Sequence, residues 1–262
     1  MMKKEKELLV AIASQKGGVG KSVFTVLLAS VLHYRKDVRV AVVDCDYPQH
    51  SIALMRERDM ESVMKNDDLK VSLYRQHERI RKPAYPVIKS DPEKGVEDLR
   101  RYMDEKGETF DIVLFDLPGT LRSEGVVYTV AAMDYIFVPL KADNIVMQSS
   151  LQFTKVLEEE LIAKGNCNLK GIRLFWNMVD RRGRKNLYDA WNRVIHRMGL
   201  RLLSSHIPNT LRYNKEADPV CKGDARSTLF PPDPRQEKDS GLPELVEEIC
   251  HAIGLEESDT ER

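Results

Sequence analysis

Short runs of aliphatic residues alternate along the chain with longer segments whose apolar residues recur at helical spacing. The aliphatic runs predict buried strands at residues 8–13, 38–43, 112–115, 135–140, 171–176 and 200–204. The periodic segments predict helices at residues 22–34, 91–103, 144–163, 185–198 and 242–253. Strand, helix and strand follow one another within the first 43 residues, an order typical of a parallel βαβ unit.

The same alternation continues along the chain, so the sequence predicts a doubly wound, mostly parallel α/β sheet with helices on both faces. We expect a single domain over residues 1–262, because no stretch has the composition of a linker. Residues 51–110 form a variable region, in which the charge-dense stretch 56–82 is either a solvated helix or an insertion. Residues 241–262 form an acidic helix and tail.

Composition places the chain among folded globular proteins, since 42% of its 262 residues are hydrophobic and 31% are charged. No apolar run approaches the roughly 20 residues that span a bilayer, so we expect no membrane segment and a cytoplasmic location. The four cysteines lack metal-ligand spacing, and we expect free thiols. The net charge is zero, but residues 164–226 carry a net +9 and residues 227–262 a net −7.

A glycine-rich loop lies between the first predicted strand and the first predicted helix. Residues 15–22 read Gln-Lys-Gly-Gly-Val-Gly-Lys-Ser. Glycines let backbone N–H groups close around phosphate oxygens, and the amino end of the following helix adds unpaired donors. Lys21 is placed to reach the phosphates, and the Ser22 hydroxyl to ligate Mg²⁺. The loop therefore predicts binding of ATP with Mg²⁺, although Gln15 stands where the strict Walker A pattern has glycine.

Three aspartates follow predicted strands at their carboxyl ends, the edge where open α/β sheets bind ligands. Asp44 and Asp46 follow the second strand, and Asp116 follows the four apolar residues 112–115. An apolar strand that ends in Asp is the Walker B pattern, which places one carboxylate beside the metal ion. We expect Asp116 and Ser22 to lie at the metal site.

Residues 16–22 are similar to the deviant Walker A motif of the ParA/MinD family of P-loop ATPases, and Gln15 makes the loop more like that of ParA partition proteins. The resemblance implies a P-loop fold, ATP hydrolysis and a homodimer that forms with ATP. It also implies that Lys16 reaches across the dimer to the partner's ATP, in the manner of an arginine finger. The implied nucleotide-binding residues of the loop are Lys16, Gly17, Gly18, Val19, Gly20, Lys21 and Ser22.

Residues 44–49 resemble the switch I segment of the family, whose common form is Asp-x-Asp-Pro-Gln, but here Tyr47 is inserted. The resemblance implies that Asp46 orients the attacking water and that Asp44 lies near the hydration shell of Mg²⁺. Because of the insertion, the division of labour between these two aspartates stays open. The implied catalytic residues are Lys16, Lys21 and Asp46.

Two further segments resemble parts of the family that line the adenine base. Asn177 follows the strand that we expect to end at Trp176, and its amide offers both a donor and an acceptor to the base. Pro208 lies in the second segment, where the backbone lines the base. The resemblance therefore implies that Asn177 and Pro208 complete the nucleotide site.

The basic segment predicts a surface for nucleic acid, because phosphate binding depends on a local patch of cations rather than on net charge. Its candidate DNA contacts are Arg181, Arg182, Arg184, Lys185 and Arg212. Arg212 matches a family arginine that contributes to DNA binding. We expect non-specific DNA binding by the ATP-bound dimer. The alternative is a solvated helix face paired with acids of the carboxyl-terminal tail.

The leading interpretation is a ParA-type ATPase that positions DNA cargo (a plasmid, a chromosome region or a mobile element) with a ParB-like or other adaptor protein. The main alternative is a ParA-like ATPase that positions a conjugation or secretion machine. A MinD-like membrane-cycling ATPase is disfavoured, because the carboxyl-terminal end is acidic rather than basic. An electron carrier like nitrogenase reductase is excluded, because no cysteine lies between Cys45 and Cys167.

Overall fold

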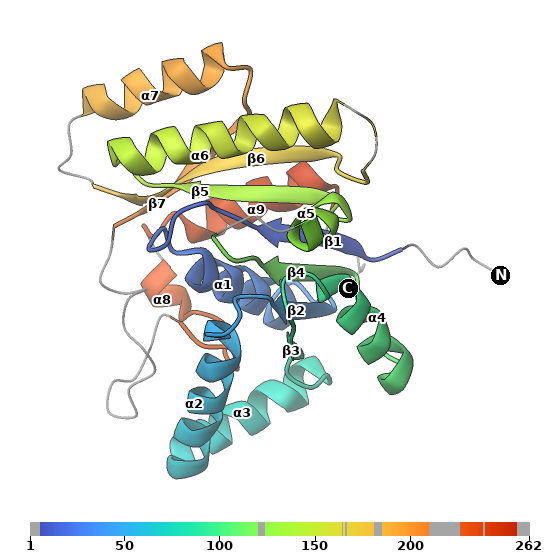
Figure 1. Ribbon diagram of the computed structural model, residues 1–262. Coiled ribbons are helices and arrows are strands. Elements are labelled where there is room, and N and C mark those ends of the chain that lie inside the picture. The colour runs from blue at the N-terminus through green and yellow to red at the C-terminus, as the bar shows by residue number, and fades with distance from the viewer. Residues whose placement is uncertain are drawn as a thin grey trace.

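The central element of the structure is a parallel β-sheet (Figure 1). The computed structural model describes residues 6–119, 124–163, 165, 167–180, 185–209, 226–237 and 239–255, with the backbone alone at 124–125, 185 and 236. Within these residues, seven strands pair in the order β3-β2-β4-β1-β5-β6-β7. Their bounds are β1 (Leu8–Ile12), β2 (Val40–Asp44), β3 (Val87–Lys89), β4 (Ile112–Asp116), β5 (Tyr135–Leu140), β6 (Gly171–Val179) and β7 (Leu202–Pro208).

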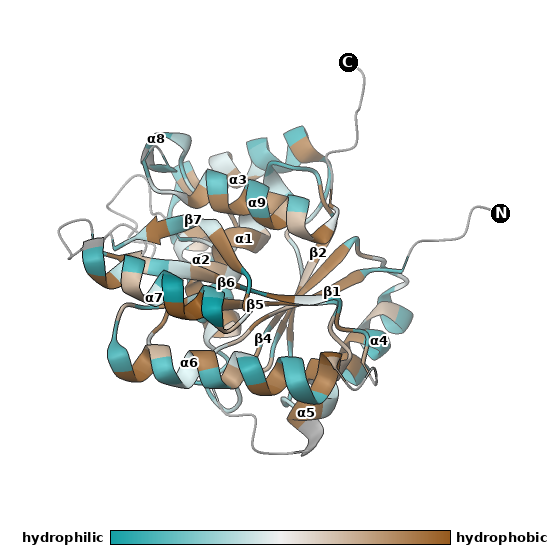
Figure 2. Ribbon diagram, turned by 90° about the horizontal axis from the view of Figure 1, so that it is seen from above, coloured by the Kyte–Doolittle hydropathy of each residue, from teal (hydrophilic) through white to brown (hydrophobic). Residues whose placement is uncertain are grey.

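Helices cover both faces of the sheet (Figure 2). Those of the described residues are α1 (Lys21–Tyr34), α2 (Ser51–Lys65), α3 (Asp67–Ile80), α4 (Gly95–Lys106), α5 (Glu124–Ala131), α6 (Asn144–Leu157) with a π-helical turn (Glu158–Ile162), α7 (Lys185–Arg197), α8 (Pro234–Glu237) and α9 (Leu242–Ile253). Helices α1 and α9 pack on one face, and α4, α5, α6 and α7 pack on the other. The predicted doubly wound fold is confirmed.

The strands alternate their side chains between two apolar cores, as expected for a parallel sheet covered on both faces. In β1, Leu9 and Ala11 join the core under α4–α7, whereas Val10 and Ile12 join the core under α1 and α9. All four side chains are at most 1% exposed. Packing on both faces therefore holds the central strands in place. It also fixes the positions from which the residues after their carboxyl ends extend.

The charge-dense stretch after β2 forms the helical hairpin α2–α3, which projects from the body of the molecule (Figure 1). Helix α2 is not fully solvated, because Ile52 and Met55 join the core beneath α1. Further along α2, Asp59 is 4% exposed and accepts hydrogen bonds from the Thr228 backbone N–H and hydroxyl, both at 2.6 Å. The stretch is thus two helices, the first of them a packed part of the fold.

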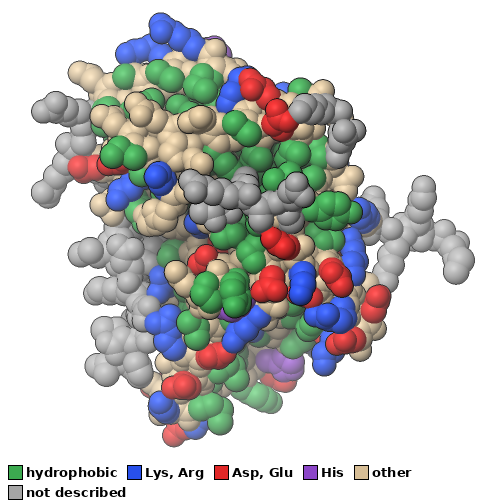
Figure 3. Space-filling model, viewed as in Figure 1, with side chains coloured by type: hydrophobic (Ala, Val, Ile, Leu, Met, Phe, Trp, Pro, Cys, Tyr) green, Lys and Arg blue, Asp and Glu red, His purple; other side chains and the backbone are tan. Residues whose placement is uncertain are grey.

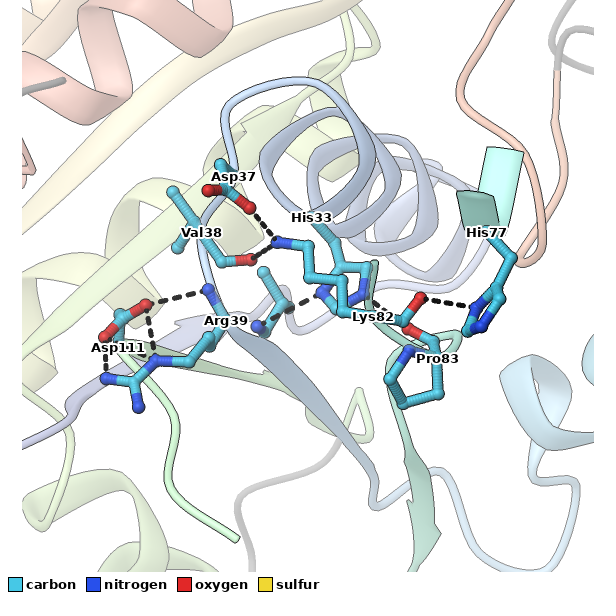
Figure 4. Close-up of polar contacts among 9 residues, drawn as sticks. His33, Asp37, Val38, Arg39, His77, Lys82, Pro83 and Asp111 are labelled. Atoms are coloured by element: carbon cyan, nitrogen blue, oxygen red, sulfur yellow. Dashed lines mark hydrogen bonds and ion pairs between the residues drawn. The ribbon is translucent and has the colours of Figure 1, made fainter. Parts of the chain in front are cut away.

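At the amino edge of the sheet, where β2 and β4 begin, a group of polar side chains pair with one another (Figure 4). His33 lies 2.9 Å through Nε2 from the Pro83 carbonyl oxygen, and its Nδ1 accepts from the Val40 N–H at 3.4 Å. This places the ring proton on Nε2. Burial lowers the pKa of His33 to about 4, so the ring is neutral near pH 7.

Two ion pairs complete this group at the amino edge. The Lys82 ammonium donates to the Val38 carbonyl oxygen at 3.2 Å and pairs with Asp37 at 2.9 Å. The Arg39 guanidinium pairs with the Asp111 carboxylate, which also accepts from the Arg39 backbone N–H at 2.8 Å. The charged groups of this edge therefore satisfy one another within the chain.

Candidate functional site

The glycine-rich loop joins the end of β1 to the start of α1. Gly18 and Gly20 have φ angles of +73° and +84°, in the left-handed region that favours glycine. Among the described residues, no side chain caps the amino end of α1, and its first turn holds no acidic residue. The loop therefore presents backbone donors and the positive end of a helix dipole, which together suit an anion.

Asn177 holds this loop from the neighbouring part of the sheet. Its Nδ2 donates to the Val19 carbonyl oxygen at 2.8 Å, and its Oδ1 accepts from the Met178 N–H at 3.0 Å. A Cβ atom at Gly20 would lie 2.6 Å from Nδ2, so the contact also requires glycine there. The amide is engaged within the chain, and its predicted contact with adenine stays a prediction.

The expectation that Asn177 follows the end of its strand is corrected. Strand β6 continues to Val179, which pairs with Pro208 at the end of β7. Asn177 interrupts the apolar run after Trp176, but backbone pairing with β7 carries the strand across this one polar residue to Val179. Asn177 and Pro208 consequently lie on adjacent strands at the carboxyl edge, and their contact with the base stays a prediction.

Asp44 and Asp116 lie side by side at the same edge. They end the adjacent strands β2 and β4 and pair in register, and Asp116 also pairs with Ile12, just before the glycine-rich loop. Asp116 thus sits between Asp44 and the loop. The structure brings together the two carboxylates that the sequence predicted for a metal site.

The Asp116 side chain is fully buried. Within the described part of the chain, neither of its carboxylate oxygens has a hydrogen-bond partner of standard geometry. Burial raises its pKa to about 7; the nearby Ser22 hydroxyl and Lys21 ammonium pull it down, and Asp44 and Asp46 push it up. A buried carboxylate left in this way is costly unless a bound group completes it.

This donor set fits Mg²⁺. Oxygen ligands from a carboxylate and a hydroxyl are those that the ion prefers, and it retains several water molecules of its own. Ser22 is half-buried at the start of α1, and Asp116 faces it from the end of β4. These two residues would hold the ion, with Lys21 beside them for the phosphates of a nucleotide.

Asp44 has a structural task as well. Its Oδ2 accepts from the backbone N–H groups of Ile52 and Ala53, both at 2.9 Å, and its Oδ1 accepts from the Asp46 N–H at 3.3 Å. Asp44 therefore caps the amino end of α2. Its hydrogen bond with the Asp46 N–H also holds the segment that carries Asp46 against the end of β2. The inserted Tyr47 points outward, with 60% of its surface exposed.

The loop entrance is exposed and braced by a residue that the sequence did not single out. Lys16 is exposed, whereas Lys21 is half-buried. The Ser149 hydroxyl of α6 donates to the Gln15 side-chain oxygen at 2.7 Å. Ser149 lies 134 residues from Gln15, and no local pattern marks it.

The predicted DNA contacts lie largely outside the described residues. Arg181, Arg182, Arg184 and Arg212 are not described, and Lys185 begins α7 with its backbone only. A cavity of about 480 Å³ lies between α7 and strands β6 and β7, and none of the predicted site residues lines it. None of the described helices is long and apolar enough to cross a membrane.

Comparison with known proteins agrees with this geometry. A family model described as the CobQ/CobB/MinD/ParA nucleotide binding domain matches residues 10–218. The chain therefore belongs to this ParA/MinD family of nucleotide-binding domains. No curated protein sequence matches the chain significantly.

Several solved structures share the fold at low sequence identity. McdA of Cyanothece in complex with ATP is 16% identical, with a TM-score of 0.61 and coverage of 97% of this chain and 99% of that one. A plasmid partition protein of Borrelia burgdorferi B31 bound to AMPPNP is 20% identical, with a TM-score of 0.58 and coverage of 96% and 99%. Cobyrinic acid a,c-diamide synthase of Mycobacterium smegmatis with ADP and magnesium is 20% identical, with a TM-score of 0.53 and coverage of 79% and 89%.

Proposed function

We propose that this chain is a ParA-type switch that binds ATP with Mg²⁺, dimerises, hydrolyses the nucleotide slowly and thereby positions or segregates DNA cargo. The observation that carries the proposal is Asp116, a fully buried carboxylate that lies beside Ser22 and Lys21 and has no hydrogen bond of standard geometry among the described residues. The family membership and the nucleotides named in related structures support it.

Each residue of the site has a task in this proposal. The loop amides and Lys21 bind the phosphates, and Ser22 and Asp116 hold Mg²⁺, which neutralises phosphate charge when bound. Asp46 orients a water molecule, and the Asp44 cap on α2 fixes the segment from which Asp46 acts. Lys16 supplies a cation to the second copy of the chain.

Loss of Lys21 tests the nucleotide site. We expect Lys21→Ala to abolish measurable ATP binding by calorimetry, because the loop loses the cation closest to the phosphates. Lys106→Ala is a matched control, since Lys106 is exposed in the last turn of α4, before β4 begins at the amino edge of the sheet. Unchanged affinity in a folded Lys21→Ala variant would reject the assignment.

Loss of Asp46 tests the dimer. We expect Asp46→Ala to bind ATP, to hydrolyse it poorly and to accumulate as a dimer in sedimentation experiments, because the nucleotide that holds the dimer persists. Wild-type protein with ADP provides the monomer reference. The same monomer mass in both samples would refute the switch, and a dimer in both would remove its dependence on nucleotide.

Cations on α7 support DNA as the cargo. Arg193 and Arg197 of this helix are exposed, and Figure 3 shows basic side chains on the surface over α7. We expect Arg212→Glu to weaken ATP-dependent retention on duplex DNA across a salt series and to leave ATP binding intact. Arg79→Glu on α3 carries the same charge change and serves as control. Retention absent with ATP, or insensitive to salt, favours a protein machine as the cargo.

A membrane-cycling role has less support. Helix α9, the last helix of the described residues, buries Leu245, Val246 and Ile249 in the core under the sheet. Its apolar face is therefore used for folding, and it does not offer an amphipathic surface to lipid.

A further inference from the structure

The residue before Lys16 is held from two sides. From α6, the Ser149 hydroxyl donates to the Gln15 side-chain oxygen at 2.7 Å. From the loop after β4, Gly119 approaches the Gln15 backbone so closely that a Cβ atom at residue 119 would lie 3.3 Å from the Gln15 carbonyl oxygen. Gln15 therefore links the phosphate loop to α6 and to the loop that follows Asp116.

Helix α6 is a firm anchor for this contact. Asp143 caps its amino end by accepting from the N–H groups of Ile145 and Val146, both at 3.0 Å. Met147 and Ser150 are fully buried on either side of Ser149. A hydroxyl on such a helix has a fixed position, so it restrains the loop residue that accepts its hydrogen bond.

The loop beyond Gln15 opens outward. Lys16 is exposed, and a Cβ atom at Gly17 or Gly18 would meet nothing within 4 Å. The φ angle of Gly17 is not in the positive range that favours glycine. Neither its backbone conformation nor crowding within the chain therefore explains why residue 17 is a glycine. The open side is where a bound phosphate or a second copy of the chain has room to approach.

We propose that the Ser149–Gln15 hydrogen bond is a positioning contact that orients Lys16 toward the phosphates bound by a second copy of the chain. The inference rests on the proposed function, because it requires the dimer in which Lys16 acts. Side chains that act across an interface depend on sub-ångström placement, so a restraint on the preceding residue affects turnover more than nucleotide affinity. Ser149 and Gln15 touch neither nucleotide nor metal in this account and act only through Lys16.

The test compares Ser149→Ala with Ser149→Thr. The alanine variant removes the donor, and we expect kcat of ATP hydrolysis to fall about fivefold while the calorimetric Kd for ATP stays within twofold. The threonine variant keeps a hydroxyl at this position, so we expect its kcat to equal that of the wild type. Ser72→Ala, on the exposed face of α3, removes a hydroxyl elsewhere and leaves both quantities unchanged.

A double variant separates this inference from the proposed function. If Ser149 acts through Lys16, adding Ser149→Ala to Lys16→Ala changes kcat no further. A loss of kcat in Lys16→Ala without one in Ser149→Ala overturns the positioning contact and leaves the switch standing. No loss in Lys16→Ala itself overturns the proposed role of that lysine. An additive loss in the double variant shows that Ser149 acts by another route and also overturns the contact.

Discussion

The two edges of the sheet treat their charged groups in opposite ways. At the amino edge, Asp111 is paired with Arg39, and both ring nitrogens of His33 have hydrogen-bond partners (Figure 4). At the carboxyl edge, the buried Asp116 has no ion pair and no hydrogen bond of standard geometry among the described residues. The same strands, β2 and β4, supply both edges, so the sheet itself does not cause the difference.

The contrast separates structural polar groups from those available to a ligand. Burial pushes the pKa of Asp111 up, but the hydrogen bonds and charge of Arg39 outweigh it and hold the pKa below its usual value. For Asp116, burial dominates and raises the pKa to about 7. A carboxylate that the protein buries and does not pair is a sign of function rather than of stability.

The largest expected effect is on hydrolysis at the carboxyl edge. We expect Asp116→Asn to lower Mg²⁺-dependent ATP hydrolysis at least about a hundredfold, because the amide carries no charge to hold the ion. Asp111→Asn, the same change at the amino edge, should leave kcat within about twofold. Phosphate-release assays on both folded variants provide the measurement, and equal losses would erase the distinction between the edges.

At the amino edge, acid should destabilise the protein through His33. Its pKa is about 4 in the folded chain, against about 6.5 when unfolded. The neutral ring makes its full contribution to the free energy of unfolding above pH 6.5, and this contribution is lost as the pH falls toward 4. It corresponds to about 3 kcal/mol over that window.

Urea unfolding between pH 7 and 4 measures this loss, and comparison with His33→Gln removes the contribution of carboxylates that titrate in the same range. Nuclear magnetic resonance follows the ring of the wild-type protein directly, which keeps the test valid if the variant does not fold. A ring that titrates near pH 6.5 in the folded protein would contradict the account.

In the protein without nucleotide, Asp116 should have the opposite effect to His33 and lower the free energy of unfolding as the pH rises. Its folded pKa is raised, so the charged form costs stability as pH rises from about 4 and costs most above pH 7. We therefore expect Asp116→Asn to raise the free energy of unfolding by roughly 1–3 kcal/mol at pH 8, since the amide is neutral but also lacks partners. The gain should vanish near pH 4. Denaturant curves at the two pH values decide the matter, and a variant less stable at pH 8 opposes the account.

The smallest effect should come from the Arg39–Asp111 pair. The two side chains are 55% and 36% exposed, so water screens their attraction. We expect Asp111→Asn to lower the free energy of unfolding by at most about 1 kcal/mol, in contrast to the gain from the same substitution at Asp116. A loss of several kcal/mol in denaturant unfolding would mean that the pair organises the edge more strongly than its exposure indicates.

Most of the fold was predictable because buried parallel strands are short aliphatic runs. Helix α9 was predicted over the residues where it occurs, 242–253. Strand β3 was missed, since it has only three residues and its middle one alone is buried. Helix α5 was also missed, because its short apolar stretch shows no clear helical period.

The site was predictable where its residues are neighbours in sequence. The glycine-rich loop and the strand ending in Asp116 are local patterns. The hydrogen bonds of Asn177 to Val19 and of Ser149 to Gln15 join residues 158 and 134 positions apart. Only the fold brings such pairs together. The capping of α2 by Asp44 was hidden for a related reason, since an Asp at a strand end serves equally as a ligand or as a cap.

Calorimetric ATP binding with and without Mg²⁺, in wild type and in Asp116→Asn, tests the central claim most directly. The account predicts that Mg²⁺ raises the ATP affinity of the wild type at least about tenfold and that Asp116→Asn loses this gain while still binding ATP through the loop. A gain of the same size in both proteins would contradict the assignment of Asp116 to the metal. Equal affinity of the wild type with and without Mg²⁺ would contradict the metal site itself.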